Sequence, residues 1–170
     1  LIIGTHNGYS VRFKENILRD MGRSATGVKG VNLREGDFVV GSSTINDSQE
    51  VLVVSENGLG KRTSADQYPT KGRGGKGIKV MNVTERTGKL AGLVTVNGSE
   101  DLMLITDTGV VIRTNVENIS QTGRSAQGVK VMRLDEDAKL VTFALVASET
   151  ELTSDEATES DSEENTSETK

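Results

Sequence analysis

The stretch "VLVVSENGLGKRT", residues 51–63, joins an aliphatic run, a tight-turn signal and a second extended run. Asn57-Gly58 is typical of a two-residue hairpin turn, because both central positions of that turn need positive φ. The same pattern occurs in "LIIGTHNGYSVRF" (1–13) and, with Thr-Gly at the turn, in "LMLITDTGVVIRT" (102–114). The sequence therefore predicts three β-hairpins at regular spacing.

The hairpins belong to a repeat of about 50 residues, which is a period typical of repeat architectures. Six positions are identical in all three copies, at offsets of 50 and 51 residues: Gly8, Gly58 and Gly109; Arg12, Arg62 and Arg113; Gly22, Gly72 and Gly123; Arg23, Arg73 and Arg124; Gly27, Gly77 and Gly128; Lys29, Lys79 and Lys130. Each copy continues with two more β-type runs. The third runs are 28–33, 78–83 and 129–134, and the fourth runs are 37–45, 89–96 and 139–146.

Four short strands in a unit of this length are typical of one blade of a propeller-like array. We therefore predict an all-β fold of about three four-stranded blades, at 1–50, 51–100 and 101–147. Helix is expected only as single turns within 15–21 and 116–121. Propellers usually have about four to eight blades. Three repeats and an apolar run that begins at Leu1 lead us to expect a piece of a larger protein.

The charge is divided between two parts of the chain. Residues 148–170 carry nine Asp or Glu and one Lys, whereas residues 1–147 carry 19 Lys or Arg and 16 Asp or Glu. The segment 148–170 has too few apolar residues to offset its ordering entropy, so we predict that it is disordered. A basic body beside an acidic tail suggests a body that binds a polyanion and a tail that competes for the same surface. A tail that only aids solubility is the alternative.

Each repeat carries a glycine-rich basic loop: "MGRSATGVK" (21–29), "KGRGGKGIK" (71–79) and "TGRSAQGVK" (122–130). Glycines let a backbone approach a ligand closely, Arg can hold a phosphate with two hydrogen bonds, and Lys supplies a point charge. The candidate DNA-contacting residues in the loops are Arg23, Lys29, Lys71, Arg73, Lys76, Lys79, Arg124 and Lys130. Arg12, Arg62 and Arg113, which follow the hairpin turns, are further candidates that either contact DNA or brace their blades.

Three similar loops on successive blades would form a stripe of positive charge. A stripe fits duplex DNA, whose phosphates dominate sequence-independent affinity, and a curved stripe would favour bent DNA. The loops contain no aromatic residue, which argues against stacking of single-stranded bases. The competing interpretation is structural, with glycines that serve turns and cations that pair with carboxylates of their own blade.

Other functional classes find little support in the sequence. There is no Cys and only one His, and Lys76 is followed by Gly77 rather than by the Ser or Thr of a phosphate-binding loop. The acidic run 135–137 fits a solvated turn better than a metal site. We expect no catalytic residue, metal or cofactor site in the chain, and no membrane span, since no apolar run reaches 18 residues.

On these motifs the chain resembles the C-terminal domain of the DNA gyrase A subunit. The stretches that carry the resemblance are "NGYSVRFKENILRDMGRSATGVKGVNLREGD", "VSENGLGKRTSADQY…GRGGKGIKVMNVTE" and "LITDTGVVIRTNVENISQTGRSAQGVKVMRLDED". The family's glycine-rich box reads Gln-Arg-Arg-Gly-Gly-Lys-Gly. Residues 73–77 match its end, but Lys71 and Gly72 replace Gln and Arg, so the loop is similar to that of a late blade.

The resemblance implies a six-bladed β-pinwheel, in which neighbouring blades exchange strands, with this chain as its last three blades and an acidic tail. It implies wrapping of duplex DNA for ATP-driven negative supercoiling in the bacterial cytoplasm. The implied partners are a second A subunit of gyrase, together with its B subunit. ATP, Mg²⁺ and the catalytic tyrosine would belong to other domains, so Tyr9 and Tyr68 are not given that role. The equivalent domain of topoisomerase IV and a propeller-type protein-interaction scaffold are the alternatives.

Overall fold

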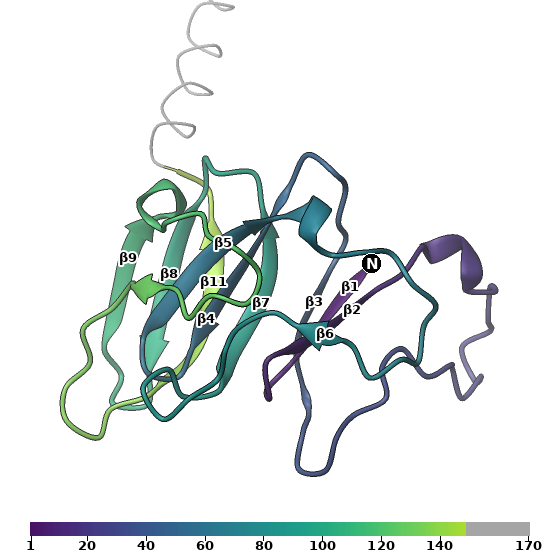
Figure 1. Cartoon of the computed structure of the whole chain (residues 1–170), viewed down its shortest axis with the longest axis horizontal. Helices are drawn as coiled ribbons and strands as arrows, with labels where there is room; N and C mark the ends of the chain where they lie inside the picture. Colours follow the sequence, from purple (N-terminus) through teal and green to yellow (C-terminus); the bar gives the residue numbers. More distant parts are fainter. Residues whose placement is uncertain (149–170) are drawn as a thin grey trace, which may run out of the picture.

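A computed structural model describes residues 1–148 and shows an all-β fold (Figure 1). Its strands are β1 (Ile2–Thr5), β2 (Tyr9–Arg12), β3 (Val39–Ser43), β4 (Glu50–Ser55), β5 (Leu59–Ser64), β6 (Ile78–Lys79), β7 (Leu90–Val96), β8 (Asp101–Thr106), β9 (Val111–Asn115), β10 (Val129–Lys130) and β11 (Leu140–Val146). The acidic segment that we predict to be disordered lies, from residue 149 on, outside the described residues.

The three predicted hairpins are confirmed. β1 pairs antiparallel with β2, β4 with β5, and β8 with β9. The turn glycines Gly8, Gly58 and Gly109 have φ values of 82°, 73° and 82°, the left-handed conformation that favours glycine. The strands and the conformation of the glycine are therefore as predicted, but the predicted two-residue turn is wrong. Asn57 does not have positive φ, and the Gly58 amide donates to the Ser55 carbonyl at 3.0 Å, so Glu56 and Asn57 are the central residues of the turn and Gly58 follows them.

Helix is limited to three short 3₁₀ turns in the described residues: η1 (Glu15–Ile17), η2 (Ala65–Gln67) and η3 (Val116–Asn118). The first and third lie in the two segments where single turns were expected. The second occupies the corresponding position of the middle repeat. It was not predicted, although the repeat period itself points to it.

Neighbouring repeats exchange a strand, as the resemblance implied. The first sheet has the order β3-β1-β2-β6 and the second the order β10-β5-β4-β7. β6 belongs to the second repeat but pairs with β2 of the first, and β10 of the third repeat pairs with β5 of the second. The third run of a repeat thus completes the sheet of the preceding repeat, not its own.

Two details of the predicted strand pattern are wrong. Residues 28–33 form no strand; within them Val31 makes only an isolated bridge to Gly75. The third sheet has three strands among the described residues, in the order β11-β8-β9. Both differences concern one position of the fold, which β6 and β10 take in the first and second sheets by pairing with the hairpin of the preceding repeat.

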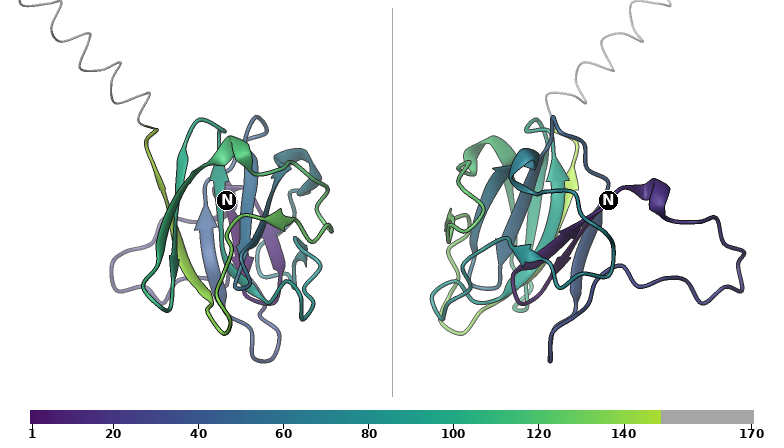
Figure 2. Two further views of the ribbon diagram at one scale, coloured as in Figure 1. Left: turned by 90° about the vertical axis from the view of Figure 1, so that its left-hand side faces the viewer. Right: turned by 45° about the vertical axis from the view of Figure 1, so that its right-hand side comes forward.

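The core consists of two apolar layers, one on each side of β4. Val51 and Val53 pack in a cluster with Ile2, Tyr68 and Leu90 toward the first sheet. Leu52 and Val54 face the opposite way, in a cluster with residues of the third sheet such as Leu102 and Leu104. All four residues from Val51 to Val54 are fully buried. The uninterrupted apolar run therefore marks a strand between two sheets, and Figures 1 and 2 show the sheets following one another.

Candidate nucleic-acid interface

The second and third basic loops begin at equivalent points of the fold. After η2 the chain runs beside the end of β2, where Thr70 forms a parallel bridge with Arg12 and the Lys71 amide donates to the Arg12 carbonyl at 2.8 Å. After η3 it runs beside β5 in the same manner, with the Thr122 amide donating to the Arg62 carbonyl at 2.9 Å. Each loop is thus anchored to the sheet of the preceding repeat.

The loops end by crossing that sheet at a glycine. Gly77 and Gly128 have φ values of 76° and 83°, and a Cβ atom at either would lie 2.6 Å or 2.5 Å from the carbonyl oxygen of Ser10 or Gly60. No other residue fits there, since both the backbone conformation and the space exclude a side chain. This repeated glycine is therefore structural.

The glycines that open the loops are different. Gly22, Gly72 and Gly123 do not have positive φ, and an added Cβ would meet nothing closer than the Gln67 side chain, 3.9 Å from Gly123. Gly22 and Gly123 do open turns, since their carbonyls accept from the amides of Ala25 at 3.0 Å and Ala126 at 3.1 Å, but ordinary residues would fit the same backbone. All three are exposed.

Successive loops are joined to each other by a repeated contact. The Arg73 guanidinium donates to the carbonyl of Lys29 at 3.3 Å, and the Arg124 guanidinium donates to the carbonyl of Lys79 at 2.5 Å. The Gly74 amide adds a bond to the Gly30 carbonyl at 2.6 Å. The arginines of the second and third motifs therefore fix their loops to the backbone carbonyl of the lysine in the loop before, and the three loops form one continuous track.

The cationic side chains along this track face solvent. Seven of the eight loop residues predicted from sequence are exposed: Arg23, Lys29, Lys71, Arg73, Lys76, Lys79 and Lys130. Arg124 is half-buried, in line with its contact to the neighbouring loop. Beside the middle loop lies a cleft of about 260 Å³, lined among others by Lys71, Gly72 and Lys76. The track thus presents charge and accessible backbone on the same surface.

A buried lysine that was not predicted as a functional residue supports the third loop. Lys61 on β5 is fully buried, and its ammonium donates to the carbonyls of Gly123 at 2.7 Å and Arg124 at 2.5 Å. Burial, and secondarily the Arg124 charge, lowers the pKa of Lys61 to about 8. The corresponding residues of the other repeats are Val11 and Ile112. A lysine where the other two repeats have an aliphatic residue is the sequence signal that could have identified Lys61.

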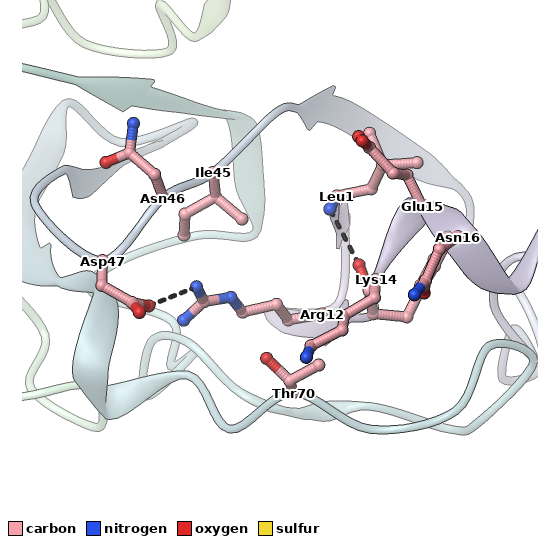
Figure 3. A pocket seen from close by; sticks show the side chains of 10 residues that line it. Leu1, Arg12, Lys14, Glu15, Asn16, Ile45, Asn46, Asp47 and Thr70 are labelled. Atoms are coloured by element: carbon pink, nitrogen blue, oxygen red, sulfur yellow. Dashed lines mark hydrogen bonds and ion pairs between the residues drawn. The ribbon is translucent and has the colours of Figure 1, made fainter.

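The arginines that follow the hairpin turns brace the blades. Arg12 bonds the Asp47 carboxylate at 2.7 Å (Figure 3). Its guanidinium also donates to the carbonyls of Ala65 and Tyr68. Arg62 bonds Glu50 at 2.8 Å and the Ile119 carbonyl at 2.7 Å. In the third repeat, Arg113 bonds Asp101 at 2.8 Å. Of the two roles left open by the sequence, these contacts favour bracing, so we place these three arginines outside the track.

Arg34 is a further basic residue of the surface that was not predicted. Its guanidinium lies 3.4 Å from the centre of the Tyr9 ring and donates to the Lys76 carbonyl at 2.6 Å. Arg34 is not part of the repeated pattern, which explains why no sequence signal pointed to it. Tyr68, the other tyrosine, is buried in the core, and burial raises its pKa to about 12.

The described part of the chain, residues 1–148, contains neither a cluster of metal-ligating side chains nor a membrane-spanning helix. No three His, Cys, Asp or Glu residues of this part lie together as they would around a metal ion. Within the same residues, no helix has the length and apolar character needed to cross a membrane. The acidic run 135–137 forms a turn, in which Asp137 has a φ of 70°.

Comparison with known proteins gives a consistent result. Residues 1–46, 49–97 and 100–147 match the family described as "DNA gyrase C-terminal domain, beta-propeller". The chain is 51% identical over 153 residues to the DNA gyrase A subunit of Staphylococcus aureus strain NCTC 8325, and 52% identical over 148 residues to that of strain MRSA252. These matches cover 89% and 86% of the chain but only 17% of each relative.

Solved structures show the same fold. A DNA gyrase A C-terminal domain aligns with a TM-score of 0.78 and 27% identity, over 85% of this chain and 49% of that one. A topoisomerase IV C-terminal domain aligns with a TM-score of 0.82 over 93% of this chain and 50% of that one, and its 23% identity supports likeness of fold alone. With three matched repeats and half of its aligned residues shared with gyrase relatives, the chain belongs to the DNA gyrase C-terminal domain family.

Proposed function

We propose that the chain binds duplex DNA without sequence preference, through the track formed by its three basic loops. The observation that carries the proposal is the repeated link from the arginine of one loop to the lysine backbone of the previous loop. This link orders the loops in a row and leaves Lys29, Lys79 and Lys130 exposed at equivalent positions. A regular row of cations suits a ligand with regularly spaced anions.

The physical basis is neutralisation of phosphates. Duplex DNA carries one negative charge per ~1.7 Å of axis, and each neutralised phosphate contributes roughly −0.9 to the slope of log affinity against log salt. The exposed Gly22, Gly72 and Gly123 would allow phosphates to reach backbone amides. Because the track runs over successive sheets, a long duplex would gain contacts by bending along it.

For the whole protein we propose the role implied by the family. The relatives are A subunits of DNA gyrase, and this chain corresponds to 17% of their length. In this role the domain wraps DNA in a bacterial type II topoisomerase of the cytoplasm, which also contains a second A subunit, together with the B subunit of gyrase. ATP and Mg²⁺ would act on other domains, and this domain would hold DNA rather than cut it. The identity to gyrase relatives favours gyrase over topoisomerase IV.

The test is DNA affinity as a function of salt, measured for two charge-matched variants of the full chain. Lys79→Gln with Lys130→Gln removes two charges from the track. Lys14→Gln with Lys89→Gln removes two charges from exposed lysines outside the three loops. We expect the track variant to lose affinity and to flatten the salt slope by about two units, since each phosphate contact contributes about one unit. The control variant should keep both.

Duplexes of increasing length complete the experiment. Affinity that rises with length until the duplex spans the three loops would support a continuous track. Equal affinity losses in both variants would show that only net charge matters and would reject the track. A flat salt slope for the unaltered chain would favour the alternative function, a protein-interaction scaffold whose cations are structural.

A further inference from the structure

The middle loop leaves the edge of β2 at one residue and returns to it nearby. It leaves where the Lys71 amide bonds the Arg12 carbonyl, and it returns where Gly77 crosses over Ser10. Val11 lies between these two points. The cleft of about 260 Å³ beside the middle loop opens here, with Val11 in its wall.

The third loop follows the same path over β5, but the space beneath it is filled. Lys61 stands where the first sheet has Val11, and its buried ammonium donates to the carbonyls of Gly123 and Arg124. A valine side chain is too short to fill the same space. The exchange of lysine for valine therefore leaves the space beneath the middle loop open.

The turn in the middle loop differs in type, which changes the groups that face this space. Gly74 has a φ of 75°, as the third residue of a type II turn requires, whereas its counterpart Ser125 does not have positive φ. Relative to a type I turn, a type II turn has its central peptide rotated by roughly half a turn. A carbonyl that binds Lys61 in the third loop is thus turned away in the middle loop, and the Gly74 amide takes its side and bonds the Gly30 carbonyl.

The cleft is lined by positive charge. Lys71 and Lys76 line it, at positions where the third loop has Thr122 and Gln127. Among the described residues that line the cleft, none is an Asp or Glu. Neither lysine forms an ion pair within residues 1–148. The cleft therefore favours an anion, unlike the space that holds the Lys61 ammonium.

The backbone of the middle loop supplies further donors. The amides of Gly72, Lys76 and Gly77 donate to no acceptor in the part of the chain that the structure describes. Amide groups that follow one another in a glycine-rich loop can form a concavity that binds an anion. Lysine ammonium groups add charge-assisted hydrogen bonds, which are stronger than neutral ones. This combination suits a phosphate group, because each of its oxygens accepts hydrogen bonds.

We propose that the cleft beneath the middle loop binds one phosphate group, held by Lys71, Lys76 and the loop amides, and that Val11 keeps the space open for it. The phosphate group belongs either to the duplex backbone or to a free oligophosphate, since both present the same oxygens. The site goes beyond the track, because it holds a single phosphate group and needs no duplex. The third loop has no such site, since Lys61 fills the equivalent space.

The experiment measures pyrophosphate binding to the full chain by calorimetry at low salt and without DNA. Val11→Lys would place a lysine beneath the middle loop, as Lys61 lies beneath the third, and would fill the cleft. We expect it to weaken pyrophosphate binding by roughly tenfold or more although it adds a positive charge, because hydrogen bonds between charged groups are lost. Val111→Lys is the control, since it adds the same charge at an exposed position outside the loops and should not weaken binding.

A second variant fills the cleft without a change of charge. Val11→Met adds an unbranched, flexible side chain of the kind that fills irregular gaps, and should weaken pyrophosphate binding by a similar factor. Circular dichroism shows whether each variant is folded, and Val11→Met decides the outcome where Val11→Lys does not fold. Unchanged or stronger pyrophosphate binding by a folded variant with a filled cleft would overturn the proposal, as would absence of binding by the unaltered chain.

The salt dependence of DNA affinity then identifies the source of the phosphate. Where a duplex phosphate occupies the cleft, Val11→Lys should flatten the salt slope by about one unit, the contribution of one phosphate contact. An unchanged slope together with weaker pyrophosphate binding would assign the cleft to free oligophosphates. Since pyrophosphate binding is measured without DNA, a chain that binds pyrophosphate but no duplex would reject the track and retain this site.

Discussion

Replacing Gly128 with alanine, and Gly27 with alanine for comparison, would separate two costs that glycine avoids: the strain of a side chain at positive φ and the clash of a Cβ atom with a neighbouring strand. Both positions have nearly the same backbone conformation, with φ values of 83° and 82°. Alanine in this region costs roughly 1 kcal/mol at either site. Only at Gly128 would the new Cβ lie 2.5 Å from the carbonyl oxygen of Gly60. Because that atom is backbone, the strands β10 and β5 must move apart.

The extra cost at Gly128 follows from the bonds at this crossing. The amides of Val131 and Met132 both donate to the Gly58 carbonyl, and each lost bond costs about 1 kcal/mol. We therefore expect Gly128→Ala to lower the free energy of unfolding by about 3 kcal/mol and Gly27→Ala by about 1 kcal/mol. For a chain of this length, 1 kcal/mol corresponds to roughly 2–4 °C in Tm.

Thermal unfolding followed by circular dichroism gives both values. The expected decreases in Tm are roughly 6–12 °C for Gly128→Ala and roughly 2–4 °C for Gly27→Ala. Equal decreases would refute the reasoning, because they would mean that the crossing over Gly60 contributes nothing. A larger decrease for Gly27→Ala would contradict the open surroundings of that residue.

Three further predictions concern the core, the braces and the buried lysine. Leu52→Ala, at a fully buried position between two sheets, should lower the free energy of unfolding by about 3 kcal/mol in urea denaturation, and a change below about 1 kcal/mol would contradict the packing. Arg62→Met should lower the free energy of unfolding by about 2 kcal/mol, because Glu50 and the Ile119 carbonyl lose their partner, and the folded protein should keep its DNA affinity. Lower DNA affinity at unchanged stability would instead show that Arg62 contacts DNA. The pKa of Lys61 is lowered to about 8 in the folded chain, against the usual lysine value of 10.5. Between these two pH values Lys61 binds a proton in the unfolded chain but not in the folded one, so the free energy of unfolding should rise with pH. Lys61→Met should abolish that rise between about pH 8 and pH 10 relative to the unaltered chain, and an identical pH dependence of the two proteins would refute the assignment.

Much of the fold follows from local pattern and from the repeat. The turn glycines have positive φ, and the aliphatic runs beside them alternate or stay apolar according to how many of their faces are buried. Residues 51–63 thus predict β4, β5 and a turn between them without any knowledge of the rest of the chain, although the turn is not of the two-residue type that Asn-Gly favours. The period of about 50 residues then places the other two hairpins and the three basic loops.

The roles of the repeated cations did not follow from the same pattern. Arg12 and Arg73 both recur in every repeat, yet Arg12 bonds Asp47 and two carbonyls, whereas the exposed Arg73 bonds the Lys29 carbonyl of the preceding loop. Which acceptor an arginine meets depends on a segment tens of residues away. Lys61 is a sharper case, because a lysine in a β-strand gives no indication that two carbonyls of the next repeat bind it.

Strands, turns, the repeat and the positions of positive charge could be predicted from the sequence, because they depend on residues that are close along the chain. Contacts between repeats settle the rest: which sheet each third run joins, which loop glycines need their conformation, and which cations remain exposed. Such contacts leave no mark on the local pattern. Gly27 and Gly77 show the difference, since they share a motif and a backbone conformation, yet only Gly77 has a neighbouring strand beneath it.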